Sequence, residues 1–427
     1  MPSYNTSLLP QDIVKDLAVS AKESAEKLIT TPEDNINNAL SHAAASIRKN
    51  ARKILDENTI DIRNGQKKDL TDAQLDRLRL CGNRIEGIAS ALDDIAKLPS
   101  PVGNVIDSWK RPNGLSIEKL TTPIGVIGMI YEARPNVTTD SAALCLKSKN
   151  AVVLRCGSEC LQTSLILHEI MQDALEIYDV PPGAIGIIPT CDRGMVAAML
   201  QTDNYIDLII PRGGTNLIER VMRESRIPVL AHLDGICHVF IHCDADPAMA
   251  HKIVMNSKLR RTGTCNAMET LLIDENFDTE QTISLIKELL DQGCEIVGDK
   301  KVQELDYRIG PAKDSDWITE YLERKLSVKF VRNYIEAVHH INTYGSKHTD
   351  AIVTNNEKVA DYFLNTVDSG SVMHNASTQF ADGGEYGMGA EIGIATGKLH
   401  ARGPVGVNQL VTYKYIVRGN GHVRSAS

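Results

Sequence analysis

The chain has 427 residues, of which 42% are hydrophobic, 24% charged and 4% aromatic, and its formal net charge is −9. That length indicates two or three domains, and the apolar content is sufficient for packed cores. An acidic chain with few aromatic residues argues against nucleic acid or an anionic membrane as a partner, because both present negative charge. No apolar stretch approaches the roughly 18 to 20 residues that span a bilayer.

The cysteine pattern indicates the compartment. The nine cysteines are an odd number, are scattered and include no CxxC pair. In a chain of this length that pattern predicts reduced thiols and a cytoplasmic protein. Residues 1–16 lack a basic region followed by an apolar run, so no secretory signal is expected there.

The first hundred residues are predicted to be helical. Thr31–Pro32 is expected to begin one helix, with Thr31 as its cap and the proline in its first turn. Thr71 and Gln74 form a capping-box pattern that opens a second helical run, which should end before Pro99.

A hairpin is predicted next. Residues 104–110 and 115–120 alternate apolar and polar side chains on either side of a Pro112–Gly114 turn. Residues 410–417 form another alternating strand near the C-terminus. These distant strands can pair with each other or across a subunit interface, and either arrangement would cover their exposed edges.

Between residues 123 and 372 the chain alternates short apolar strands with helices, which predicts an α/β fold with parallel sheets. The expected helices include 160–178 and 216–226. The expected strands are 125–130, 151–155, 185–188 and 208–210, followed by a second series that starts at Val239 and includes 270–273, 328–331 and 351–354.

Two glycine-bearing turns are candidates for phosphate binding. No GxGxxG fingerprint and no P-loop occurs, but Pro123–Gly128 and Pro211–Asn216 each lie at a predicted strand. Glycines at a strand-to-helix turn let backbone N–H groups approach a phosphate. The alternative is that both are ordinary tight turns.

Cys265 is the candidate nucleophile. It lies between a predicted helix and strand, in a run of small residues preceded by Arg260 and Arg261. Neighbouring arginines favour a thiolate, and small neighbours leave room for a substrate. The alternative is a packed core thiol, because free cysteine is among the most buried residue types. The other eight cysteines are interpreted mostly as packing residues.

The histidines raise the question of a metal. His238 and His242 point to the same face of a predicted strand. No carboxylate or cysteine stands at convincing ligand spacing, so a structural role is favoured and no metal is predicted.

Taken together, six segments resemble the aldehyde dehydrogenase superfamily over essentially the whole chain. They are most similar to its members that reduce an acyl phosphate, L-glutamate 5-phosphate, to L-glutamate 5-semialdehyde in proline biosynthesis. The segments are 123–137, 151–159, 210–221, 260–273, 320–331 and 348–354.

The resemblance implies an aldehyde dehydrogenase-like fold with two Rossmann-like parallel-sheet domains and a small oligomerisation β element. Residues 1–103 and 123–237 would bind the cofactor, and residues 238–395 would carry the catalytic cysteine. Residues 104–122 and 408–427 would join subunits into a dimer or a larger homo-oligomer. A glutamate kinase is a further partner that the resemblance suggests.

The resemblance also assigns roles to single residues. It makes Cys265 the nucleophile, and Arg134 or Asn136 a donor to the oxyanion. With NADPH/NADP as the cofactor, Arg155 would contact the adenosine ribose, Gly213 and Gly214 the pyrophosphate, and Glu320 the nicotinamide ribose. Substrate contacts are expected from Arg260, Arg261, Asn375 and Ser377, although the two arginines can equally be a solvated helix end.

One departure from the superfamily is informative. General aldehyde dehydrogenases carry a Glu-Leu-Gly-Gly-Lys run whose glutamate activates water, and this chain has His232–Ile236 instead. Loss of that base suits an enzyme whose product is an aldehyde, because activated water would divert a thioester to the acid. Three readings stay open: an acyl phosphate reductase, a CoA-acylating or hydrolytic aldehyde dehydrogenase, and a non-catalytic scaffold.

Overall fold

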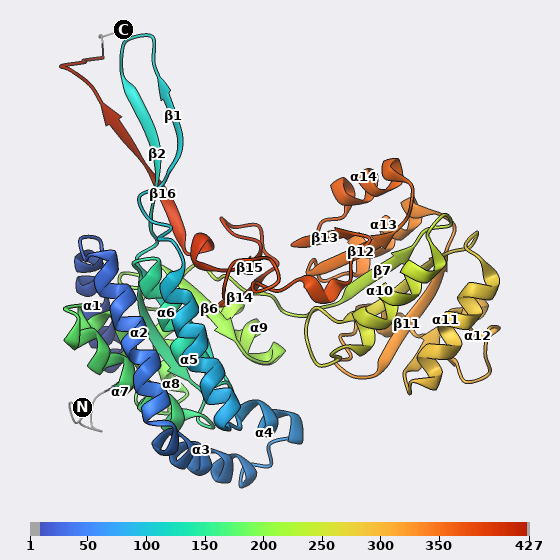
Figure 1. The fold of residues 1–427 in the computed structure, drawn as a ribbon, viewed down its shortest axis with the longest axis horizontal. Coiled ribbons are helices and arrows are strands. Elements are labelled where there is room, and N and C mark those ends of the chain that lie inside the picture. Colours follow the sequence, from blue (N-terminus) through green and yellow to red (C-terminus); the bar gives the residue numbers. More distant parts are fainter. Residues whose placement is uncertain (1–8, 425–427) are drawn as a thin grey trace. The chain divides into compact units, whose positions relative to one another are not determined.

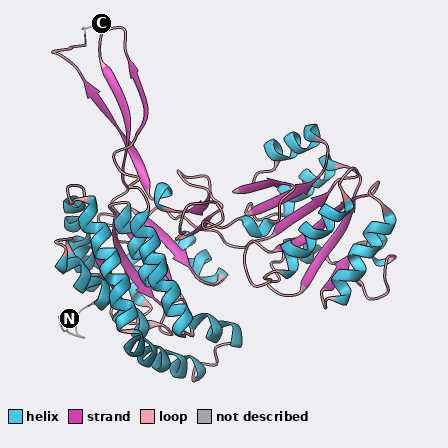
Figure 2. Cartoon of the chain, in the orientation of Figure 1, coloured by secondary structure: helices cyan, strands magenta, loops and turns pink. Residues whose placement is uncertain are grey.

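The computed structural model describes residues 9–424 (Figure 1). The chain forms two compact units, both of them mixtures of helices and strands (Figure 2). The first contains residues 1–231, 388–393 and 405–427, and the second contains residues 232–387 and 394–404. The outer ends of the expected segments 1–103 and 408–427, residues 1–8 and 425–427, lie outside the described residues.

The first unit begins with helices, as predicted, although the cap at Thr31 is wrong. The Thr31 hydroxyl donates back to the Lys27 carbonyl at 3.1 Å, and Pro32 is the residue that precedes the second helix. Thr31 therefore completes the end of the first helix instead of starting the next. The helices are α1 (Pro10–Leu28), α2 (Glu33–Lys49), α3 (Ala51–Gln66), α4 (Asp72–Leu78) and α5 (Gly82–Lys97).

The capping box at Thr71 and Gln74 is confirmed, but the helix that it opens is short. The single helix that was predicted is interrupted between α4 and α5, where the buried side chain of Asn58 in α3 makes hydrogen bonds to the backbone. Its side chain donates to the Leu78 carbonyl at 2.9 Å and accepts from the Leu80 N–H at 2.8 Å. Those tertiary hydrogen bonds replace the intrahelical ones.

The predicted hairpin and C-terminal strand pair with each other. β1 (Val105–Lys110) and β2 (Ser116–Pro123) are antiparallel, and β16 (Val411–Arg418) adds to the free edge of β2, also antiparallel. Figure 1 shows the C-terminal strand alongside the hairpin. The register pairs Tyr415 with Lys119.

The core of the first unit is a four-stranded parallel sheet in the order β5-β4-β3-β6. Because β3 is followed by β4 and β5 on one side and by β6 on the other, the strand order reverses between β3 and β6, where open α/β sheets bind ligands. The elements are β3 (Val126–Tyr131), α6 (Val137–Lys147), β4 (Ala151–Cys156), α7 (Leu161–Ile177), η1 (Pro182–Ala184), β5 (Ile185–Ile187), α8 (Gly194–Leu200), β6 (Leu208–Arg212), α9 (Thr215–Glu224) and, near β16, η4 (Val407–Gln409).

The second unit contains a seven-stranded sheet in the order β10-β9-β11-β8-β7-β12-β13, and every pair is parallel, as predicted. Its central strands are fully buried, which explains their continuous apolar runs. The strands are β7 (Cys237–Ile241), β8 (Met268–Asp274), β9 (Glu295–Gly298), β10 (Gly310–Pro311), β11 (Lys325–Val331), β12 (Thr349–Val353) and β13 (Ser371–His374).

Helices connect these strands, as parallel pairing requires. They are α10 (Pro247–Leu259), α11 (Thr279–Asp291), α12 (Lys300–Gln303), η2 (Asp314–Ile318), α13 (Tyr334–Tyr344), α14 (Glu357–Thr366) and η3 (Thr378–Phe380). Two short strands, β14 (Gly393–Ala395) and β15 (Gly403–Val405), lie where the chain passes between the units. No helix among residues 9–424 is both long and apolar enough to cross a membrane.

Candidate active site

Cys265 lies in a turn between α10 and β8, and its side chain is partly exposed. Two hydrogen bonds shape the turn: the Ala267 N–H donates to the Thr264 carbonyl, and the Thr264 hydroxyl donates to the Arg261 carbonyl, both at 3.0 Å. Of the other cysteines, Cys145, Cys156, Cys160, Cys237 and Cys294 are buried, whereas Cys81, Cys191 and Cys243 are exposed. Cys265 is therefore not a packed core thiol, and a reagent can reach it.

Gly235 supports the cysteine turn from behind. A Cβ atom on Gly235 would lie 1.9 Å from the Cys265 carbonyl oxygen and 2.6 Å from its Cα, so only glycine permits this approach. The Gly235 N–H donates to Oε1 of Glu320 at 2.8 Å. Glu320, predicted to be a cofactor residue, therefore also fixes the backbone on which the cysteine rests.

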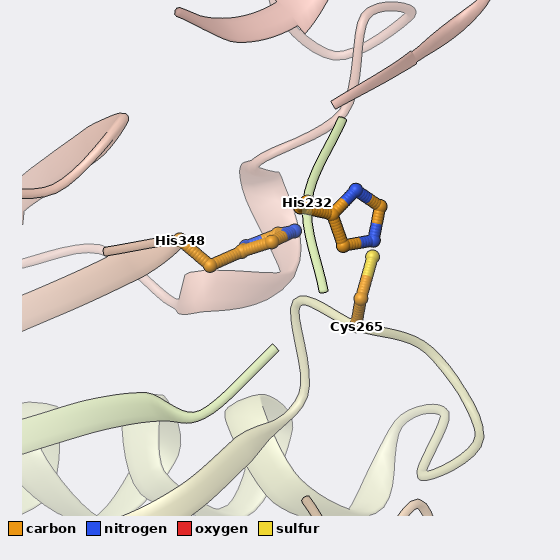
Figure 3. Close-up of side chains that lie close together, drawn as sticks. All are labelled: His232, Cys265 and His348. Atoms are coloured by element: carbon orange, nitrogen blue, oxygen red, sulfur yellow. The ribbon is translucent and has the colours of Figure 1, made fainter. Parts of the chain in front are cut away.

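Two histidines accompany the sulfur. Figure 3 shows Cys265 with its sulfur beside a ring nitrogen of His232, and His348 nearby. One ligand atom from each of the three side chains lies within 4.8 Å of the other two. The His232 and His348 rings meet edge to face, with centroids 5.2 Å apart and an interplanar angle of 76°.

Sequence reasoning missed these neighbours. In the sequence, His232 stands only as the first residue of the run that replaces Glu-Leu-Gly-Gly-Lys of general aldehyde dehydrogenases. The residue type alone could have pointed to His232, because imidazole is the commonest general base. His348 gave no local signal, because only the fold brings it to the turn.

Cys237, at the start of β7, lies beneath the site. Burial holds the pKa of its thiol far above the usual value, so the group stays protonated and can donate a hydrogen bond. Its sulfur lies 3.2 Å from the Cys265 carbonyl oxygen and 3.7 Å from Nδ1 of His348. Of these two thiols, Cys265 is therefore the one that a reagent can reach.

The predicted structural role of His238 and His242 agrees with their contacts. His238 Nδ1 lies 2.9 Å from Asp350 Oδ1 within the core, and His242 Nδ1 lies 2.6 Å from Asp244 Oδ1. Two groups among the described residues are nevertheless near enough to hold a metal ion: His232, Cys265 and His348, and His242, Cys243 and Asp274. The absence of a metal therefore stays a prediction.

The candidate cofactor residues of the first unit lie at the carboxyl ends of its strands. Arg155 is the last residue but one of β4 and is only 7% exposed, and its Nε has no hydrogen-bond partner among the described residues. Gly213 and Gly214 form an exposed turn between β6 and α9. A Cβ on Gly213 would lie 2.6 Å from Glu132 Oε2, so a side chain there would displace the Glu132 carboxylate, whereas a Cβ on Gly214 would meet no atom within 4 Å.

These features fit a nicotinamide dinucleotide. The glycine turn lies at the point where the strand order of the sheet reverses, and it leads into the N-terminus of α9, whose amides favour phosphate. The buried guanidinium of Arg155 has a donor to spare for a ribose or phosphate oxygen.

The candidate oxyanion donors, Arg134 and Asn136, also belong to the first unit, between β3 and α6. Ala133 has a φ of 45°, and its N–H donates to Glu159 Oε1 at 2.7 Å, which fixes the bend that precedes them. Asn136 donates through Nδ2 to Asp140 Oδ2 at 2.8 Å. Burial raises the pKa of the Asp140 carboxyl to about 6.

The candidate substrate residues differ in their exposure and in the hydrogen bonds that they already make within the protein. Arg260 and Arg261 are exposed, and Arg260 Nη1 makes one long hydrogen bond, 3.3 Å, to Gln379. Asn375 bonds the Thr354 backbone through both side-chain atoms. Ser377 is buried, with its hydroxyl 3.0 Å from that of Ser257. For Asn375 and Ser377 a substrate role stays a prediction.

The parallel sheets and the accessible cysteine turn agree with a comparison to known families. Residues 5–327 match the model of the aldehyde dehydrogenase family. The chain therefore belongs to that family, whose members are oxidoreductases. The predicted resemblance and the predicted fold class are confirmed.

More specific similarity comes from named relatives. A γ-glutamyl phosphate reductase of Paramagnetospirillum magneticum is 51% identical over 412 residues, which cover 96% of this chain and 97% of the relative. Another, of Novosphingobium aromaticivorans, is 51% identical over 413 residues and covers 97% of each chain. Within the family the chain belongs with the γ-glutamyl phosphate reductases.

Solved structures agree. The crystal structure of a γ-glutamyl phosphate reductase from Thermotoga maritima has a TM-score of 0.94 at 38% identity, covering 96% of this chain and all of that one. An acetylating aldehyde dehydrogenase from Geobacillus thermoglucosidasius has a TM-score of 0.70 at 18% identity, covering 99% of this chain and all of that one. The second likeness shows the fold alone.

Proposed function

We propose that this chain reduces L-glutamate 5-phosphate to L-glutamate 5-semialdehyde with release of phosphate, using NADPH, as a cytoplasmic step of proline biosynthesis. The observation that carries the proposal is the partly exposed Cys265 thiol, held in a fixed turn in a chain that is similar along 96% of its length to γ-glutamyl phosphate reductases.

In this reaction the Cys265 sulfur attacks the acyl carbon. The carbon–sulfur bond forms, the bond to the phosphate oxygen breaks, and phosphate leaves with the electron pair, so that a thioester remains. The Cys265 N–H and either Arg134 or Asn136 are the proposed donors to the intermediate oxyanion. When bound, the cofactor supplies the hydride that converts the thioester to the aldehyde.

The remaining site residues are proposed to bind the cofactor and the phosphate group of the substrate. Arg155, Gly213, Gly214 and Glu320 are the proposed cofactor residues, supported by the spare donor of Arg155 and the exposure of the glycine turn. Arg260 and Arg261 are the proposed phosphate residues, because both are exposed cations in the segment that leads to Cys265.

The three-stranded sheet of β1, β2 and β16 is the proposed subunit contact. It carries apolar and aromatic side chains that are well exposed, including Trp109 at 37%, Tyr415 at 56% and Val417 at 56%. Exposed apolar groups gathered on one small sheet are typical of an interface. A homodimer is the smallest assembly that would cover them.

The reaction type is tested in the oxidative direction. Reduction of NADP by L-glutamate 5-semialdehyde should require phosphate, because phosphate takes the acyl group from the thioester. Arsenate, which can accept the acyl group in the same way, should replace phosphate. A requirement for coenzyme A would instead identify a CoA-acylating enzyme, and activity with no acceptor a hydrolytic one. Either of these results would overturn the proposal.

The nucleophile is tested by substitution. Cys265→Ser should abolish turnover while NADPH binding, followed by fluorescence, persists. The matched control is Cys243→Ser, which removes an exposed thiol of the same unit and should leave turnover unchanged. Turnover retained in Cys265→Ser would refute the assignment.

A further inference from the structure

His232 is placed to exchange a proton with Cys265. One of its ring nitrogens lies within 4.8 Å of the sulfur, and Figure 3 shows that nitrogen facing the sulfur. Both residues belong to the second unit. A base beside a thiol is the arrangement that activates cysteine nucleophiles.

The hydrogen bond on the other side of the ring decides which nitrogen can act as the base. His232 Nδ1 lies 2.8 Å from the carbonyl oxygen of Ile394. A carbonyl can only accept, so Nδ1 must carry the hydrogen, and Nε2 of the neutral ring is left with its lone pair. The fold therefore selects the tautomer whose free lone pair can accept a proton from the thiol.

The neighbouring imidazole is less suited to that role. His348 is fully buried, whereas His232 is partly exposed and can exchange its proton with solvent or a bound substrate. Nδ1 of His348 lies 2.9 Å from the Thr349 hydroxyl and 3.7 Å from the Cys237 sulfur. Its edge-to-face contact helps to fix the orientation of the His232 ring.

We propose that His232 is a catalytic base: its Nε2 takes the proton of the Cys265 thiol as the sulfur attacks, and the imidazolium then gives this proton to the departing phosphate. The carbon–sulfur bond forms, the carbon–oxygen bond to phosphate breaks, and thiol plus acyl phosphate yield thioester plus hydrogen phosphate. The identity of the acyl phosphate rests on the proposed function, whereas the proton transfer from Cys265 does not.

The proposal also accounts for the replacement of glutamate by histidine. In the general family the residue aligned with His232 activates water against the thioester, whereas here the same position would serve the thiol.

The first test uses iodoacetamide and no substrate. The rate of Cys265 alkylation at pH 7, read by mass spectrometry of its peptide, should be at least about tenfold slower in His232→Asn than in the wild type. Asparagine can keep the hydrogen bond to the Ile394 carbonyl while it removes Nε2. His339→Asn, an exposed histidine of the same unit, should alkylate at the wild-type rate. Equal rates for His232→Asn and wild type would overturn the proposal.

A second test separates the base from a structural role. In His232→Ala, added imidazole should restore the alkylation rate several-fold, whereas pyrazole, a ring of the same size but a far weaker base, should not. Restoration by both rings or by neither would contradict a proton-transfer role. Because neither measurement uses an acyl phosphate or a cofactor, failure of the proposed function would leave both results intact.

Discussion

Gly235 and Cys265 touch through their backbones: the position where a Cβ would extend from Gly235 lies 1.9 Å from the Cys265 carbonyl oxygen. The segment that precedes β7 therefore packs directly against the backbone of the cysteine turn. The position of the sulfur depends on the absence of one methyl group two residues before a buried strand.

Gly235→Ala should displace the cysteine turn. We expect a loss of about 1–3 kcal/mol in the free energy of unfolding, because the new methyl group overpacks the site. Turnover should fall by more than about tenfold, since small displacements of a nucleophile are costly. Gly263→Ala is the matched control, because a Cβ there would approach no atom closer than 3.9 Å. Normal turnover in Gly235→Ala would show that the contact does not position Cys265.

Glu320 is expected to have a structural role besides any contact with a cofactor. Its Oε1 accepts from the Gly235 N–H, and the amide oxygen of Glu320→Gln can also accept, whereas Glu320→Ala cannot. Urea unfolding should therefore show a loss of about 1–3 kcal/mol for the alanine variant and a clearly smaller loss for the glutamine variant. Identical stability of the two variants would indicate that the hydrogen bond contributes nothing.

Asp140 should make stability depend on pH. Its folded pKa of about 6 lies above the usual value of 3.8, so the neutral carboxyl is the form that the fold favours. That contribution is complete below about pH 4 and is lost as the pH rises through 6. Relative to Asp140→Asn, the wild type should lose up to about 3 kcal/mol between pH 4 and pH 7. Parallel stability curves for the two proteins would contradict the raised pKa.

The three-stranded sheet should carry the oligomer. The Trp109 and Tyr415 rings lie 6.2 Å apart, on β1 and β16, and both are exposed. Replacing both by glutamate introduces charge on this surface, and light scattering should then give the monomer mass. Tyr307→Glu, at a residue that is 95% exposed in the other unit, should leave the mass of the assembly unchanged. An unchanged assembly in the double variant would locate the interface elsewhere.

Much of the fold could be predicted because its signals are local. The strand expected at 151–155 is found at Ala151–Cys156, since a short apolar run is what a fully buried parallel strand requires. The interruption between α4 and α5 could not be predicted, because its cause is Asn58, a buried residue of another helix whose partners the periodicity does not reveal.

For the candidate site, too, residues marked by a local pattern could be predicted, and those brought together by the fold could not. Cys265 is a candidate from local sequence, because small residues flank it and two arginines precede it, and the family resemblance implies its role as nucleophile. The proximity of His232 depends on the path of the chain before β7, and the selection of its tautomer depends on Ile394, far along the chain. Interactions between distant segments give the cysteine its chemical surroundings, and no local pattern encodes them.

Cys265 should become acylated during turnover, because the thioester is the intermediate through which the proposed reaction passes. Mixing the protein with L-glutamate 5-semialdehyde and NADP in the absence of phosphate, followed by an acid quench, should trap the thioester. Mass spectrometry should then find a glutamyl adduct on the peptide that contains Cys265, and phosphate added before the quench should remove it. An adduct on a different residue, or phosphate-dependent turnover with no acylated cysteine at any time, would contradict a Cys265 thioester mechanism.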